Sequence, residues 1–451
     1  MDDIDAILNS MAAKTGNVSA VKVAESIPAS KSALKKRKHV LSASSPGDNS
    51  AIWNADVQIE LRHIGSSEHK VRPCNLQNVS PAYELHRQKC VLKLKAKLSA
   101  AVEQMGLPKL PNSAYETWQF CSKLAVPDGD PLIPHSDSDY AGLRDELVAI
   151  GANRHAANKT CRAMTQEAHR VGQSLLRLAH GGGKKRATIR PNEDHYLVSY
   201  GGTSLRLNRT HLDKLQTLFD RHHAEAATQS FPDFLFCLLL RYESLDGGGF
   251  QAALNEECFD VLLRHFDCNM ECFASPFNSR YGRFCSAFLD TDRVFGSFGS
   301  FFDFHPTSGC FEANPPFVPA LIAKMASHMT LCLQNATKAL SFIVIIPAWE
   351  HTEGWQLLKN SPFNKEYLLL SQKHHGYCEG KQQMRPTRYR IASFDTSVFF
   401  WQNAMAASKW PVTDAALDDL RLAFKSKQSE ERDDLGLKQG GKKVKRVKAS
   451  S

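Results

Sequence analysis

The hydrophobic pattern in the first half of the chain is mainly helical. In residues 83–102, leucine and valine recur every three or four positions, which predicts an amphipathic helix. Two short runs of strand-forming residues, at 195–200 and 204–208, flank Gly201 and Gly202, and this arrangement predicts a β-hairpin. The same helical spacing predicts further helices over residues 140–150 and 158–178, from His211, and over residues 234–242.

After residue 255 the pattern becomes an alternation of strands and helices. Helices are expected at residues 255–266 and 319–334. Strands are expected within residues 270–278, 284–292, 309–313, 340–349, 366–370 and 397–402. This alternation predicts an α/β fold with a mostly parallel sheet and helices on both faces, in which ligands bind at the carboxyl ends of the strands.

Composition excludes several classes of protein. Hydrophobic residues make up 42% and charged residues 23% of 451 residues, which is ordinary globular usage. No apolar run reaches the roughly 18–20 residues needed to span a bilayer, and the acidic start MDDIDAILNSM is no signal peptide, so we expect no membrane partner. The twelve cysteines form no CxxC pair, so we expect reduced thiols and no metal site.

The net charge of +9 is a property of the chain ends. Residues 31–38 carry five basic side chains and residues 438–448 carry six, with no acid in either segment. These eleven charges exceed the net charge, so the rest of the chain is slightly acidic. We expect four parts: a disordered basic tail at 1–78, a helical accessory domain at 79–192, an α/β domain at 193–424, and a disordered basic tail at 425–451. The basic runs favour a nuclear location, with the cytoplasm as an alternative.

The strongest chemical signal is the tetrapeptide Asn314, Pro315, Pro316 and Phe317, directly after the strand-like segment CFEA. An amine conjugated to an aromatic ring is a poor nucleophile because its lone pair is delocalised. The Asn314 side-chain oxygen and a proline carbonyl can accept hydrogen bonds from such an amine and aim its lone pair at a methyl donor. Phe317 can stack on the ring. The alternative, a strand-ending Asn-Pro turn, has no such chemistry.

The methyl donor needs contacts upstream of this motif. The turn after the first strand, at Ala274, Ser275 and Pro276, fits the first contact. Asp290 and Asp292 end the second strand, where an acid commonly binds a nucleoside ribose; a cap or turn role is the alternative. We also assign donor binding to Asn314 and to the glycine-rich turn of Phe295, Gly296 and Ser297, whose bare backbone permits a close approach.

Residues 271–349 closely resemble the phosphorylated-carboxy-terminal-domain-interacting factor family. The segments ECFASPFN, CSAFLDTD, FGSFGSFFDFHPTSGCFEANPPF and LSFIVIIPAW carry the resemblance, and VSYGGTSLRLNRTHLDKL and WQFCSKLAVPDGDPLIP extend it. It implies a Rossmann-like methyltransferase domain with an N-terminal helical domain. It also implies S-adenosylmethionine as cofactor and N6-methylation of the first transcribed 2′-O-methyladenosine beside the m7G cap of mRNA.

In the family the cap lies in a basic groove between the two domains. From charge alone, we assign this role to two groups of side chains: Lys89, Lys93 and Lys97, one face of the first helix, and Lys184, Lys185 and Arg186, in a glycine-rich loop. A solvated helix face is the alternative for the first group. Animal members also carry a WW module with two tryptophans about 20–23 residues apart, whereas Trp53 stands alone, so polymerase carboxy-terminal-domain binding does not carry over.

Three other functions remain open at this stage. The chain could methylate adenine N6 in another RNA or in DNA, or it could be a non-catalytic RNA-binding protein with a methyltransferase-like fold. Protein-glutamine methylation is disfavoured by the basic tails and the long helical region.

Overall fold

The computed structural model describes residues 79–111, 113–177, 185–223, 230–245, 252–378 and 389–434. The predicted tail at 1–78 lies outside these residues, as does the end of the chain from residue 435. The last helix, α14 (Asp414–Asp434), continues past residue 425, so the C-terminal tail was predicted to begin too early.

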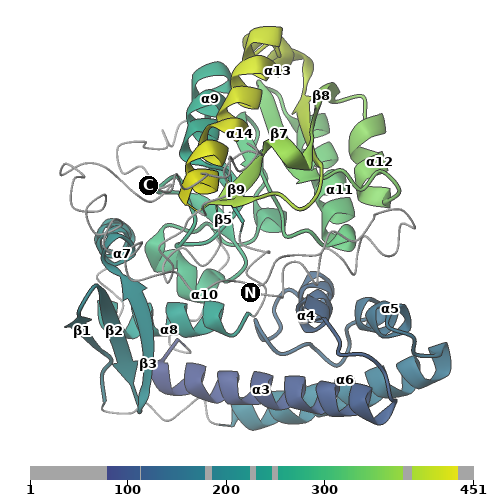
Figure 1. The fold of residues 1–451 in the computed structure, drawn as a ribbon, viewed down its shortest axis with the longest axis vertical. Coiled ribbons are helices and arrows are strands. Elements are labelled where there is room, and N and C mark those ends of the chain that lie inside the picture. The colour runs from purple at the N-terminus through teal and green to yellow at the C-terminus, as the bar shows by residue number, and fades with distance from the viewer. Residues whose placement is uncertain are drawn as a thin grey trace, which may run out of the picture.

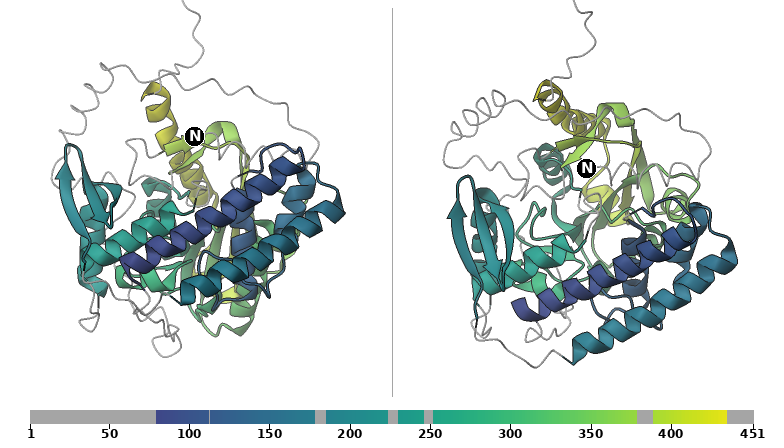
Figure 2. Two further views of the ribbon diagram at one scale, coloured as in Figure 1. Left: turned by 90° about the horizontal axis from the view of Figure 1, so that it is seen from below. Right: turned by 60° about the horizontal axis from the view of Figure 1, so that its bottom comes forward.

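The first body of the protein consists of helices and one small sheet. Long helices α3 and α6 lie side by side, and the sheet stands at one end of α3 (Figures 1 and 2). Its strands form the predicted hairpin and one further strand, in the antiparallel order β1-β2-β3. The elements are α3 (Pro81–Gln104), α4 (Ser113–Ala125), α5 (Ala141–Ala149), α6 (Arg154–Leu176), β1 (Thr188–Asn192), β2 (His195–Tyr200), β3 (Thr203–Asn208), α7 (Arg209–His222) and α8 (Phe231–Glu243).

Local sequence signals account for helix α3. The Ser80 hydroxyl accepts a hydrogen bond from the Tyr83 backbone N–H at 3.2 Å, and Pro81 occupies the first helical turn, where its missing N–H costs nothing. Val91, Leu94 and the apolar residues after them at helical spacing are buried against the rest of the first body.

The second body is built on a six-stranded sheet in the order β5-β4-β6-β7-β11-β8. Strands β5, β4, β6 and β7 are parallel, while β11 pairs antiparallel with both β7 and β8. Five of the six strands therefore run in one direction and only β11 is reversed, so the sheet is mixed but mostly parallel, as predicted. The strands are β4 (Cys268–Ala274), β5 (Phe284–Ser286), β6 (Gly309–Ala313), β7 (Leu340–Pro347), β8 (Asn364–Leu370) and β11 (Thr396–Gln402), and β9 (Gly376–Cys378) pairs separately with β10 (Tyr389–Ile391).

Helices cover both faces of this sheet, as the strand pattern predicted. Helices α11 (Pro319–Asn335) and α12 (Glu353–Asn360) share one apolar core with the sheet, and α9 (Glu256–Phe266) and α14 share another. Every residue of β7 is buried, as expected for a central strand packed on both faces. Short helices α10 (Leu289–Asp292) and α13 (Ala404–Lys409) complete the described α-helices of this body, which also has 3-10 turns η4 (Arg293–Phe295), η5 (Phe301–Asp303) and η6 (Gln372–His374). The chain thus has the predicted α/β class, with a Rossmann-like layered sheet and N-terminal helices.

The division between the two bodies differs from the expected boundary at residue 193. Val198 of the hairpin, Leu215 of α7 and Phe236 of α8 are buried in the same core as Leu94 and Val171 of the long helices. We therefore count the hairpin, α7 and α8, up to Leu245, with the first body, although the same core also takes in Phe277, Phe288, Val294 and Phe295 from the segment after β4. None of the described helices is both long and apolar enough to cross a membrane.

Candidate active site

A cavity of about 770 Å³ lies between the two bodies. On the side of the large sheet it is lined by Ser275, Ser286 and Asn314, which follow or end strands β4, β5 and β6. Strand β4 has β5 on one side and β6 on the other, so the order reverses at β4 and leaves a crevice beyond its carboxyl end. Side chains of the first body, Arg87 and His169 among them, close the opposite wall.

Asn314 lines this cavity, and of its two amide atoms only the nitrogen makes a hydrogen bond within the described residues. It follows directly after β6, and its Nδ2 donates a hydrogen bond to the Ala252 carbonyl oxygen at 2.9 Å. Its Oδ1 is buried and has no hydrogen-bond partner within the described residues. An unmade hydrogen bond of this kind costs about 1–3 kcal/mol, so such an atom marks a place where a ligand donor fits.

The other residues of the tetrapeptide differ in their relation to the cavity. Pro316 lines the cavity, and its carbonyl oxygen accepts a hydrogen bond from the Val318 backbone N–H at 2.7 Å. Pro315 is buried, and neither it nor Phe317 lines the cavity. The Phe317 ring makes T-shaped contacts whose centroid distances are 5.4 Å to Phe394, 6.2 Å to Tyr377 and 6.4 Å to Trp349. Stacking of Phe317 on a substrate base therefore stays a prediction.

The turn after β4 forms another part of the wall. Ala274, Ser275 and Asn278 line the cavity, whereas Pro276 does not. The Asn278 Oδ1 accepts hydrogen bonds from the Ser275 backbone N–H at 2.7 Å and from its hydroxyl at 2.9 Å. This turn therefore has a fixed shape, set by its own side chains.

The two predicted ribose-binding acids have different environments. Asp290 lines the cavity, whereas Asp292 is fully buried and does not. The Tyr242 hydroxyl donates to the Asp292 Oδ2 at 2.6 Å, and the Thr291 hydroxyl donates to its Oδ1 at 2.8 Å. Burial raises the pKa of Asp292 to about 6, although these hydrogen bonds oppose the change. Asp292 is thus placed to orient Tyr242, which lines the cavity, and not to contact the donor itself.

The predicted donor-binding turn of Phe295, Gly296 and Ser297 supports the wall from behind and does not line the cavity. The Ser297 hydroxyl lies 2.7 Å from that of Ser286, which does line it. Gly296 has a φ of 106°, and a Cβ there would clash with the carbonyl oxygen of Gly282. The glycine is required by close packing of two backbone segments, which explains the sequence motif without a ligand contact.

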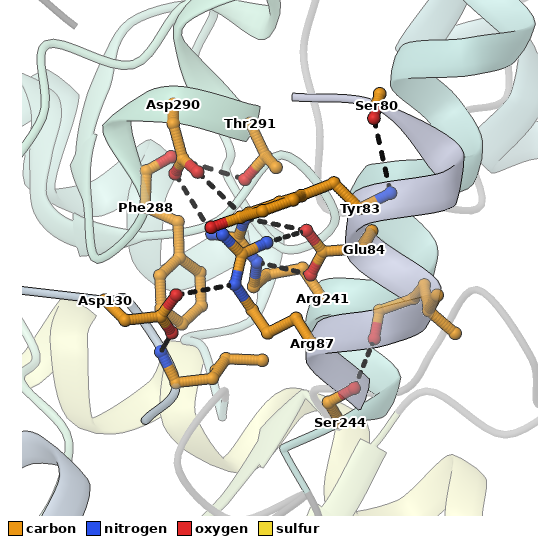
Figure 3. A network of polar contacts seen from close by, with 12 residues as sticks. Ser80, Tyr83, Glu84, Arg87, Asp130, Arg241, Ser244, Phe288, Asp290 and Thr291 are labelled. Atoms are coloured by element: carbon orange, nitrogen blue, oxygen red, sulfur yellow. Dashed lines mark hydrogen bonds and ion pairs between the residues drawn. The ribbon is translucent and has the colours of Figure 1, made fainter. Parts of the chain in front are cut away.

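A buried network of charges joins the two bodies beside the cavity (Figure 3). Arg241 of α8 is completely buried, and its guanidinium donates to both oxygens of Glu84, at 2.7 and 2.9 Å, and to both oxygens of Asp290, at 3.0 and 2.8 Å. Arg87 pairs with Glu84 and donates from Nε to the Asp130 Oδ2 at 3.1 Å. Helices α3, α8 and α10 and the loop after α4 therefore meet in one chain of ion pairs.

The charges of this network balance one another. Burial alone would raise the pKa of Asp290, but the Arg241 guanidinium holds that pKa well below its ordinary value. Lys123 also lines the cavity. Burial lowers the pKa of its ammonium group, and the nearby Asp290 carboxylate partly opposes this change. Two arginines and one lysine thus face three carboxylates, so the network needs no counterion from solvent.

The predicted cap-binding lysines are not brought to the cavity. Lys93 and Lys97 lie 3.8 and 3.1 Å from the Glu167 carboxylate of α6, and Lys89 is exposed. Hydrogen bonds from Arg170 and Lys97 lower the pKa of Glu167 to about 2, so this acid keeps its charge. The lysine face was predicted from the sequence of α3 alone, whereas the acid that pairs with it, Glu167, lies on α6.

The basic loop gives a similar result. Arg186 pairs with Asp233 at 2.7 Å, Lys185 is exposed, and neither lines the cavity; Lys184 lies outside the described residues.

Sequence reasoning missed the basic residues that do line the cavity. Lys324 of α11 donates a hydrogen bond across the two bodies to the Leu124 carbonyl oxygen at 2.9 Å. Arg87, which lines the cavity, and Arg241, which is buried behind it, gave no signal because nothing in the sequence links them to Glu84, Asp130 or Asp290. Asp130 lies in the segment WQFCSKLAVPDGDPLIP, so the family resemblance offered a pointer to that residue. Across the described residues, no three His, Cys, Asp or Glu side chains are grouped to hold a metal ion.

Replacing Arg241 with methionine should destabilise the protein strongly. The change leaves Glu84 and Asp290 buried without their shared cation, and breaking a buried ion pair costs about 3–5 kcal/mol. Urea unfolding should show this loss, while Arg421→Met, which removes an exposed pair with Asp418, should lose less than about 1 kcal/mol. Equal stabilities for the two variants would contradict the structural role of the network.

Asp292 should make stability fall as pH rises from about 4 to 6. Its pKa is higher in the folded state than its ordinary value of 3.8, so the folded protein binds this proton more tightly and loses that advantage as pH passes about 6. The loss is on the order of 3 kcal/mol. Unfolding free energies measured at several pH values should fall less steeply for Asp292→Asn, and parallel curves for both proteins would rule out the effect.

Part of this chain is similar in sequence to known proteins. The family model described as "Phosphorylated CTD interacting factor 1 WW domain" matches residues 214–380. These residues run from within α7 to just beyond β9 and include four parallel strands of the large sheet. The predicted absence of a two-tryptophan module concerned Trp53, which lies outside the described residues.

Two curated relatives carry the same name, mRNA (2′-O-methyladenosine-N(6)-)-methyltransferase. The proteins from Mus musculus and Homo sapiens are each 36% identical to this chain over 240 residues, which is 51% of this chain and 34% of each relative. The chain spans about one third of the length of these relatives. The predicted resemblance to the phosphorylated-carboxy-terminal-domain-interacting factor family is thereby confirmed over residues 214–380, which include Asn314.

Proposed function

We propose that this protein is an S-adenosylmethionine-dependent methyltransferase. We further propose that it methylates N6 of the first transcribed 2′-O-methyladenosine beside the m7G cap of mRNA. The observation that carries the proposal is the buried, unpartnered Oδ1 of Asn314 at the wall of a large cavity. The names of the mouse and human relatives support the substrate.

The residues present fit a bound S-adenosylmethionine. Ser275, Asn278 and Ser286 offer polar groups at the ends of β4 and β5, and Asp290 offers a carboxylate that Arg241 holds ionised. A ribose binds through its hydroxyls to such a carboxylate. When bound, S-adenosylmethionine supplies an electrophilic methyl group on its sulfonium sulfur.

The chain's own contribution is to position the target amine. The hydrogen bond from Asn314 Nδ2 to the Ala252 carbonyl fixes the amide plane, so that Oδ1 can accept from one N–H of the adenine amine. We assign the second acceptor to the Pro316 carbonyl, because Pro316 lines the cavity and its carbonyl oxygen, which binds Val318 through one lone pair, keeps a second. Two acceptors hold the nitrogen lone pair toward the donor, and no strong base is needed.

The first body provides the surface on which we place the rest of the substrate. Phe120, Asp128, His135, His169 and Gln173 line the part of the cavity contributed by that body. Carboxylate and amide oxygens accept hydrogen bonds from the edges of bases, and aromatic rings stack on their faces. We therefore assign recognition of the capped nucleotide to the loop after α4 and to α6, in place of the lysine face. We also propose a nuclear location, from the two basic segments outside the described residues.

Asn314→Ala should remove methyl transfer while leaving the fold intact. The variant loses one hydrogen-bond acceptor at the reacting amine, and loss of one such group costs about 100- to 1,000-fold in kcat. Methyl incorporation into m7G-capped RNA that begins with 2′-O-methyladenosine measures this, with donor binding as the check on the fold. Asn335→Ala, on the exposed end of α11, is the matched control. Activity near that of the control would contradict the role of Asn314.

The cap requirement separates the proposal from its alternative, an adenine N6-methyltransferase acting on other nucleic acids. We expect incorporation into capped RNA with a 2′-O-methylated first adenosine, and at least tenfold less into the same RNA with a 5′ triphosphate or into DNA. Preferred methylation of uncapped RNA or DNA would support the alternative. Donor binding without any methylation would support a non-catalytic RNA-binding protein.

A further inference from the structure

Two buried charged side chains that do not line the cavity bind the backbone of the turn between β4 and β5. Lys214 of α7 is 1% exposed, and its Nζ donates to the Phe277 carbonyl oxygen at 3.1 Å and to the Ser279 carbonyl oxygen at 2.8 Å. A single ammonium group thus binds two backbone carbonyls of one turn, from a helix that belongs to the other body.

Glu271 of β4 binds the other end of the same turn. It is 2% exposed, and its Oε2 accepts hydrogen bonds from the backbone N–H groups of Arg280 at 2.8 Å and Tyr281 at 3.3 Å. Together with Lys214 it satisfies four backbone groups between residues 277 and 281. The backbone groups of an irregular turn have few hydrogen-bond partners within the turn itself. These two side chains therefore supply the hydrogen bonds that neighbouring strands supply to one another in a sheet.

Burial of these two groups is costly, so the contacts they make are significant. Burial lowers the pKa of Lys214, which Glu271 opposes, and burial raises the pKa of Glu271, which its backbone hydrogen bonds oppose. Glu312 lies beside Glu271 on β6, in register with it, and burial and that neighbour raise its pKa well above the ordinary value.

The upper side of this turn faces the cavity through Ser275 and Asn278, whose hydrogen bonds to each other were described above. Phe277 anchors the middle of the turn against Tyr242, with ring centroids 5.4 Å apart. We propose that Lys214 and Glu271 are positioning residues for the methyl donor: they fix the turn that carries Ser275 and Asn278 without touching the donor. This inference rests on the proposed donor site.

Lys214→Met tests the inference because methionine keeps the length and apolar character of the side chain but loses the ammonium group. We expect binding of S-adenosylhomocysteine, measured by calorimetry, to weaken at least tenfold. The KM for the donor should rise by a similar factor, with kcat at saturating donor changed less than threefold. Lys159→Met, at an exposed position on α6, is the control and should bind as the wild type does. Unchanged donor affinity in a folded Lys214→Met variant would overturn the inference.

Glu271 provides a second test that does not depend on the folding of the lysine variant. Glu271→Gln keeps an oxygen that can accept from Arg280 and Tyr281, whereas Glu271→Met has none. We expect donor binding to survive largely in the first variant and to fall at least tenfold in the second, and equal affinities would overturn the inference. If the wild-type protein binds no S-adenosylhomocysteine, the proposed donor site itself fails, which is a distinguishable result.

Discussion

The arrangement of the whole molecule depends on the burial of one guanidinium group. Arg241 has no access to solvent, so its charge must be met by protein, and Glu84 and Asp290 meet it from two different directions. Glu84 belongs to the first helix of the helical body, and Asp290 follows a strand of the large sheet. Neither acid can leave without exposing an uncompensated charge in the interior, so the two bodies are held at one relative orientation.

That orientation creates the cavity and determines what lines it. Asp290 lies in the wall on the side of the sheet, and Arg87, which shares Glu84 with Arg241, lies in the opposite wall. Lys324 bonds to Leu124 and provides a further contact across the two bodies. The Asn314 amide therefore lies where the carboxyl ends of the strands meet a surface built from helices, and a ligand in this space contacts both bodies. Residues that act together here are separated by up to about half of the sequence.

The sequence predicted most of the secondary structure and the central residue of the site. Hydrophobic spacing placed α3, the hairpin and the strands of the sheet because each pattern reflects local periodicity, and Asn314 was found because its motif is contiguous. The predictions that differed concern relations between distant segments. The lysines of α3 could not be matched to Glu167 of α6 from one helix alone. Gly296 and Ser297 were predicted to contact a ligand because the sequence alone does not show whether a glycine is required by a nearby ligand or by a nearby backbone segment. The direction of β11 and the body to which the hairpin belongs are likewise set by tertiary packing.

The hydrogen bond from Asn314 to Ala252 has a mechanical consequence. Ala252 lies where the chain passes from the helical body, which ends at Leu245, into the body of the sheet, so the amide that we propose to hold the target amine is tied to the connection between them. A shift of the Ala252 backbone would rotate the amide even if every residue of the tetrapeptide stayed the same. The orientation of the Asn314 side chain thus depends on how the two bodies pack together. In a molecule whose two bodies are not fully packed, the Asn314 Oδ1 would lie at the wrong angle.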